Sequence, residues 1–302
     1  MTRAIYATNL EPTPATALLA SLRWPVGSSL EVLHAIPPRR DLLLRSRAPD
    51  AAMLATHRAQ VSISTLALGE TLRGQPVTLH DATRLGDPAE VIARRAGEVN
   101  ADLVVVGAPR RDNFLKRDTV VSRLIERAPC SVLIARTAQL RRLLLADDAS
   151  AGADRAATVV GRSPLLTDLP VVVVTVIDVI TPIVVTPYGR YAEATELVHE
   201  RAVARTRVDA RVAELARRGR VVRGLVREGG PAGELLSVVR ELEIDCVVLG
   251  PSATNFFDQI LVGSVARALA ADAECSVLIA RVPGKETRSA QDAVDIAGES
   301  AI

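Results

Sequence analysis

The chain has 302 residues, of which 48% are hydrophobic and only 2% aromatic, and its 37 basic and 35 acidic residues leave a net charge of +2. This length suffices for two domains with full cores, and the hydrophobic content excludes a disordered chain. Arginines interleave with acids, which excludes the clustered basic face typical of nucleic-acid binders. The core must be built from aliphatic side chains, as in helices packed on a parallel sheet.

The cysteines and histidines have no spacing typical of a disulfide framework or a metal site. We interpret Cys130, Cys246 and Cys275 as small buried residues, with a redox role as the alternative. The first residues lack the pattern of a signal peptide, and an Asp and a Pro interrupt the longest apolar run, 169–185. These features favour a cytoplasmic protein without a membrane partner.

The predicted elements alternate between strand and helix along the first half. Asp87 is expected to cap a helix in which Pro88 takes the first position. The strands are predicted over 3–9, 29–36, 75–82, 101–107 and 130–136, and the helices over 14–24, a long region ending near 73, 87–99 and 118–128.

The second half repeats this order, with strands predicted over 141–148, 169–178, 220–229, 244–250 and 275–281. Continuous apolar strands that alternate with helices predict a doubly wound parallel five-stranded sheet in each half, with helices on both faces. Ligands of such sheets bind outside the carboxyl ends of the strands.

Two copies of one unit are visible in the sequence. Residues 86–107 are echoed 143 positions later, and "APCSVLIAR" at 128–136 is echoed 145 positions later by "AECSVLIAR". We therefore predict one domain over 1–137, a second over 141–282 and a polar tail over 283–302. The apolar last strand of each copy is expected to pair, between the two copies and between subunits of a homodimer.

One stretch, "VLGPSATNFFDQILVGSVARAL" at 248–269, places Gly250 at a strand end and Gly263 and Ser264 at a helix start. Backbone N–H groups at such a start form an anion site. The alternative is that the glycines are flexible joints and Ser264 only caps the helix. Without the lysine of a P-loop, a P-loop ATPase is not supported.

The order of these motifs resembles the universal stress protein family over nearly 1–282. The resemblance implies an adenine-nucleotide α-hydrolase-like fold in each half. In the ATP-binding branch of the family, a loop Gly-x-x-Gly-(nine residues)-Gly-Ser/Thr holds ribose and phosphates. Here that loop reads Gly250, Ala253, Gly263 and Ser264, with Ala in place of one glycine. If Ala253 needs a positive φ, its conformation costs about 1 kcal/mol.

Two further positions complete the family's site in the second half. Asp148, followed by Ser150, takes the place of the Asp after the first strand, which meets the ribose or orients an ion. Val176 takes the place of the hydrophobic residue that touches adenine. The resemblance thus implies a site made of Asp148, Val176, Gly250, Ala253, Gly263 and Ser264.

The first half departs from the family's pattern. Asn9 replaces the Asp, Arg110 replaces the second glycine, and Asp118 and Thr119 align with the Gly-Ser pair. An Asp at a helix start would cap the helix and repel phosphate. We therefore expect no nucleotide in the first half.

The sequence favours a stress-response protein that binds ATP or a related adenine nucleotide in the second half, with Mg²⁺ for charge compensation. Hydrolysis would be slow or absent, and the ligand would change conformation or assembly. The alternative is a scaffold of the same fold that binds no nucleotide. An enzyme of this fold comes third, because no catalytic set is found and at most a slow ATPase is expected.

Overall fold

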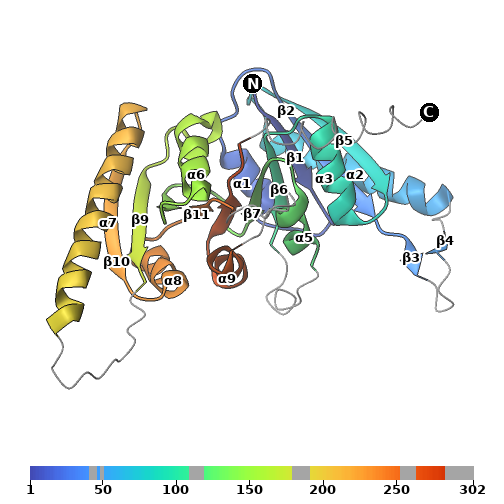
Figure 1. Cartoon of the computed structure of the whole chain (residues 1–302). Coiled ribbons are helices and arrows are strands. Elements are labelled where there is room, and N and C mark those ends of the chain that lie inside the picture. Colours follow the sequence, from blue (N-terminus) through green and yellow to red (C-terminus); the bar gives the residue numbers. More distant parts are fainter. Residues whose placement is uncertain (41–45, 48–50, 109–118, 179–190, 252–262, 283–302) are drawn as a thin grey trace, which may run out of the picture.

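The computed structural model describes residues 1–40, 46–47, 51–108, 119–178, 191–251 and 263–282. Within these ranges both halves contribute to one ten-stranded sheet in the order β10-β9-β8-β11-β12-β7-β6-β1-β2-β5 (Figure 1). Each half has five parallel strands, as predicted, and the two sets meet where β12 pairs antiparallel with β7. The predicted tail over 283–302 lies outside the described residues.

The strands of the first half are β1 (Arg3–Ala7), β2 (Ser28–Ile36), β5 (Val77–Leu85), β6 (Leu103–Gly107) and β7 (Ser131–Ala135). Those of the second half are β8 (Leu143–Ala146), β9 (Val171–Ile177), β10 (Val222–Glu228), β11 (Cys246–Leu249) and β12 (Ser276–Ile279). A two-stranded ribbon, β3 (Arg39–Arg40) and β4 (Ser46–Arg47), follows β2 and was not predicted.

The helices of the first half are α1 (Ala15–Ser21), α2 (Ala51–Thr71), α3 (Pro88–Glu98) and α5 (Val120–Arg127). Those of the second half are α6 (Ala151–Arg162), the 3₁₀ turn η1 (Pro164–Leu166), α7 (Tyr191–Arg217), α8 (Pro231–Glu241) and α9 (Ser264–Asp272). The prediction for α1 ran three residues past its C-terminal end and began one residue early; Pro25 disfavours helical geometry in Trp24, the residue before it. The Asp87 cap is confirmed, since its side chain accepts the Glu90 N–H.

Aliphatic side chains fill both faces of the sheet. Helices α1, α2, α6 and α7 pack on one face, and α3, α5, α8 and α9 on the other. The three cysteines are buried in these cores, as predicted. Burial raises the pKa of the Cys130 thiol to about 12 and that of Cys275 to about 11, which disfavours the reactive thiolate.

The junction of the halves has internal pseudo-symmetry. Leu133 of β7 pairs with Leu278 of β12, its own counterpart in the repeat. The Arg281 N–H donates to Ser131 Oγ at 3.0 Å, and in the mirrored contact the Arg136 N–H donates to Ser276 Oγ at 3.1 Å. The predicted pairing of the two copies is therefore confirmed.

Because β7 and β12 pair with each other, the predicted homodimer through these strands is wrong. Both β7 and β12 have hydrogen-bonded neighbours on each side, so neither is a free edge for a second chain. The edges of the sheet are β5 and β10 instead. Among the described residues, no helix is both long and apolar enough to cross a membrane.

Candidate functional site

A cavity of about 150 Å³ opens at the carboxyl ends of β8 and β11 in the second half. These two strands are adjacent in the sheet, and the chain order reverses direction across them. Open α/β sheets bind their ligands at such a point. Asp148, Val176 and Gly250, which follow or end three separate strands, all line this cavity.

Apolar side chains form most of the cavity wall, with a carboxylate at its rim. Val174 and Val176 come from β9, Leu249 from β11, and Leu235 from α8. The exposed Asp148 carboxylate accepts the Ser150 N–H at 3.0 Å, which orients it at the end of β8. An apolar slot with few polar groups is typical of sites for flat organic ligands.

Helix α9 begins beside this cavity, since Val265 and Ala266 of its first turn line it. Its N-cap is Gly263, which offers no side chain to the first N–H groups. Ser264 is the first helical residue and does not cap the helix, so that part of the alternative is wrong. N–H groups without a side-chain cap are available to an anion. Ala253 lies outside the described residues.

Gly250 has a packing role in addition to its place at the cavity. A Cβ at this position would come within 1.8 Å of the Gly152 carbonyl oxygen, in the first turn of α6. In turn, a Cβ at Gly152 would come within 2.2 Å of the Pro251 oxygen. The two glycines let the end of β11 and the start of α6 touch, so Gly250 is required by the fold whether or not a ligand binds.

A buried ion pair, not anticipated from the sequence, supports the Asp148 loop. The Asp147 side chain is 1% exposed and accepts a hydrogen bond from Nε of Arg211 on α7 at 2.8 Å. Arg211 also pairs with Asp154 and Glu214. Burial opposes the charge of Arg211, yet its acidic partners hold its pKa above the ordinary value. This network fixes where β8 ends.

The same loop contains a strained residue. Ala149, between Asp148 and Ser150, has φ +61°, a region that disfavours residues with a Cβ. Its counterpart in the first half, Leu10, has φ +69°. The sequence raised the question of a positive φ at Ala253, which lies outside the described residues, and gave no sign of the one at Ala149.

The start of α5, which corresponds to the start of α9, has a side-chain cap in the first half. Thr119 caps α5 by accepting the Ser122 N–H, and Ser122 Oγ accepts the Thr119 N–H in return. The predicted cap by Asp118 is therefore wrong, and Asp118, Arg110 and Arg111 lie outside the described residues. Asn9 donates to Glu11 at 2.9 Å, so its amide is engaged within the loop.

The first half has a histidine pair, His34 and His57, where the second half has Thr175 at the position of His34. His34 on β2 aligns with Thr175 on β9, and both donate to the carbonyl after the first strand, at 2.8 Å to Thr8 and 2.8 Å to Asp147. The carbonyl only accepts, so His34 Nδ1 carries the proton. His34 Nε2 then accepts from His57 Nδ1 at 3.0 Å when both rings are neutral. Burial lowers the pKa of His34 from 6.5.

Comparison with known proteins defines the class. The family model of the universal stress protein family matches twice, over residues 8–136 and 139–281. The chain therefore belongs to the universal stress protein family and carries two copies of its domain.

Individual relatives agree with this assignment. Universal stress protein MJ0531 of Methanocaldococcus jannaschii is 36% identical over 59 residues, which span 20% of this chain and 35% of that protein. A universal stress protein from Archaeoglobus fulgidus has the same fold, with a TM-score of 0.61 and 14% identity, over 94% of this chain and 97% of that one. Protein PA1789 of Pseudomonas aeruginosa, described as functionally unknown, matches with a TM-score of 0.54 and 15% identity, over 93% and 92% of the two chains.

Proposed function

We propose that the second half binds ATP or a related adenine nucleotide and that the first half does not. One observation carries the proposal: Asp148, Val176 and Gly250, which are far apart in sequence, line one cavity beside the uncapped start of α9. An apolar cavity of about 150 Å³ is known to hold an aromatic ring such as benzene. The cavity thus suits the base, with phosphates outside it.

Each part of the nucleotide has a candidate partner. Val174 and Val176 would contact the base, and the Asp148 carboxylate would accept from a ribose hydroxyl. The N–H groups of Gly263 and Ser264 would meet a phosphate, favoured by the positive end of the helix dipole. Ala253 would belong to the same loop by its place in the sequence. Among these partners Asp148 is the one titratable side chain, and with its carboxylate engaged by ribose or Mg²⁺ we expect little or no hydrolysis.

Mg²⁺ would accompany the phosphates. Across the residues that the structure describes, no cluster of three or more His, Cys, Asp or Glu could hold a metal ion. Mg²⁺ commonly keeps several waters and binds through substrate phosphates with one or two carboxylates. Asp148 is the exposed carboxylate at the cavity rim and would be such a ligand.

We further propose that the nucleotide acts through conformation or assembly in a cytoplasmic stress response. The Asp148 loop and α9 come from opposite ends of the second half in sequence, so a shared ligand would couple them. A homodimer stays part of this proposal, formed by surfaces other than β7 and β12. Size-exclusion chromatography with and without Mg–ATP would detect a change in assembly.

The scaffold alternative has one observation in its favour. The packing of Gly250 on Gly152 explains that glycine without any ligand. It does not account for the cavity, nor for the uncapped start of α9. The two functions differ in one property, which is nucleotide binding by protein freed of carried-over ligand.

Calorimetric titration of Mg–ATP into the full chain tests the proposal. Gly263→Asp should weaken binding at least about a hundredfold, because it sets a carboxylate against phosphate. Thr119→Asp is the matched control, since it adds the same charge at the counterpart helix and should leave affinity unchanged. Absence of binding to the nucleotide-free wild type would favour the scaffold.

A further inference from the structure

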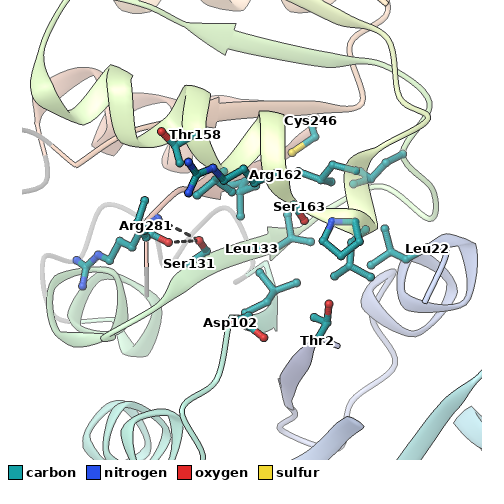
Figure 2. A pocket seen from close by; sticks show the side chains of 18 of the residues that line it. Thr2, Leu22, Asp102, Ser131, Leu133, Thr158, Arg162, Ser163, Cys246 and Arg281 are labelled. Atoms are coloured by element: carbon teal, nitrogen blue, oxygen red, sulfur yellow. Dashed lines mark hydrogen bonds between the residues drawn. The ribbon is translucent and has the colours of Figure 1, made fainter. Parts of the chain in front are cut away.

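A second cavity, of about 220 Å³, lies at the junction of the two halves (Figure 2). None of its lining residues belongs to the nucleotide cavity. Leu103 and Leu133 of the first half and Cys246 and Leu278 of the second contribute from the sheet. Leu22, Val159, Leu165 and Leu166 add apolar side chains from the helices and turns around it.

The architecture explains why a cavity forms here. Helices α5 and α9 belong to the core on the opposite face of the sheet. On this face, α1 comes from one half and α6 from the other, and the β7–β12 pair lies at their boundary. Leu133 and Leu278, which pair across that boundary, are left beneath an apolar opening.

One arginine, Arg162, marks one end of this cavity. It ends α6, and Figure 2 shows it near Thr158, away from Thr2 and Leu22, whereas the side chain of Arg281 points away from it. Arg155 lies two turns earlier on the same helix, on the side that carries Thr158 and Arg162. Within the described part of the chain, no carboxylate forms an ion pair with any of the three arginines.

Arg281 carries a buried charge. The residue is 6% exposed, and its guanidinium donates to the carbonyls of Ala128 and Ile125 at the end of α5. Its Nε is buried without a hydrogen-bond partner. Burial lowers the pKa of Arg281 to about 10, against the opposing effect of Cys130, and the charge of Arg155 lowers it further. The carbonyls at the C-terminal end of α5, which is the negative end of the helix dipole, compensate part of this charge.

One carboxylate, Asp102, lines the cavity among the described residues, and it accepts the Arg3 N–H at 2.8 Å. Arg162 lines the cavity without a carboxylate partner among the described residues, and Arg155 adds to the positive field. The site therefore combines apolar walls with an excess of positive charge at one end. A neutral ligand would not compensate this positive charge. A ligand with several negative charges would have to lose its water shell next to leucine side chains, which is unfavourable.

We propose that this cavity binds a small hydrophobic carboxylate, with its carboxylate on the Arg162 guanidinium and its hydrocarbon chain over Leu133 and Leu278. Arginine pairs with carboxylate through short, charge-assisted hydrogen bonds. The volume exceeds the roughly 150 Å³ that takes benzene, so a medium-length alkyl chain fits its scale. The proposal is independent of nucleotide binding, because the two cavities share no residue.

Calorimetric titration with octanoate tests this site in the full chain. Octanol has the same chain without charge and should bind at least about tenfold more weakly, since a hydrogen bond to a charged group is lost. Acetate, which lacks the chain, should not bind measurably. Equal affinity for octanoate and octanol, or no heat with octanoate up to millimolar concentration, would overturn the proposal.

Two variants locate the ligand. Arg162→Gln should weaken octanoate at least about tenfold and leave octanol unchanged. Val159→Phe fills part of the cavity from a half-exposed position and should weaken both. Arg205→Gln, an exposed cation on α7, is the control and should change neither. Unchanged octanoate affinity in Arg162→Gln, or competition between octanoate and Mg–ATP, would place the ligand elsewhere.

Discussion

The two halves share one fold, but the N-terminus of the last helix is capped in the first half and has no side-chain cap in the second. In the first half, Thr119 and Ser122 satisfy each other's backbone N–H groups and close the start of α5. In the second half, Gly263 leaves the start of α9 open beside a cavity. The comparison teaches that one duplicated unit can become a structural partner while the other keeps the features of a binding site, with few changes in sequence.

The largest predicted effect concerns the buried ion pair between Asp147 and Arg211 of the second half. Thr8 stands in the first half where Asp147 stands in the second. Arg211→Met leaves the Asp147 carboxylate buried without its partner and should lower the free energy of unfolding by about 3–5 kcal/mol. Denaturant unfolding measures this change.

Two further variants sharpen that result. Arg205→Met breaks an exposed pair with Asp209 on the same helix and should cost less than about 0.5 kcal/mol. The double change Asp147→Thr with Arg211→Met replaces Asp147 by the residue at its first-half counterpart, Thr8, removes both charges, and should restore most of the loss. If Arg211→Met is as mild as Arg205→Met, the ion pair does not support the loop.

The next effect in size separates the two helix starts. Thr119→Ala removes the cap of α5 and should cost about 1 kcal/mol. Ser264→Ala, at the aligned position of α9, should cost only a few tenths, because Ser264 caps nothing. Thermal unfolding of the two variants compares them directly. A larger loss in Ser264→Ala than in Thr119→Ala would reverse the assignment of the open and closed ends.

A smaller effect tests the strain that both halves keep. Ala149→Gly should stabilise the chain by about 0.5–1 kcal/mol, since glycine adopts positive φ freely but loses more entropy on folding. Leu10→Gly relieves the same strain in the first half but removes a side chain that packs on the core, so we expect no net stabilisation from it. Ala210→Gly, at an exposed position inside α7, should destabilise by about 1 kcal/mol and is the control. Destabilisation by Ala149→Gly would contradict the left-handed conformation.

The smallest predicted effect is a pH dependence confined to the first half, because it involves one proton. The pKa of His34 is lowered in the folded state from 6.5, so the unfolded chain binds more protons as pH falls. Stability should therefore be complete above about pH 6.5 and decline below it. His34→Thr, which copies Thr175 of the second half, should remove this dependence in unfolding curves between pH 7 and about 5. A curve unchanged by the substitution would exclude His34 as the source.

Much of the fold follows from local sequence patterns. Apolar runs predict every strand of the large sheet, and the repeated "CSVLIAR" predicts that the last strands of the two copies pair, while the register of Leu133 with Leu278 comes from the structure. The resemblance to the family's motif order predicted that Asp148, Val176 and Gly250 lie at one site, and they line one cavity. What stayed hidden depends on contacts between distant segments. Arg211 lies 64 residues from Asp147, and neither follows a pattern that points to the other.

Three further features depend on three-dimensional context in the same way. Alanine at position 149 gives no sign that its φ is positive, because that residue type normally avoids the region. The packing of Gly250 on Gly152 is set by how α6 meets β11. The second cavity exists only where two halves meet, so its arginines look in sequence like ordinary surface charge.

The central claim is that one half binds nucleotide and the other does not. Equilibrium dialysis of the nucleotide-free full chain against labelled Mg–ATP counts the sites at saturation. The structure leads us to expect one nucleotide per chain, lost in Gly263→Asp and kept in Thr119→Asp. Two nucleotides per chain, or none, would contradict the account.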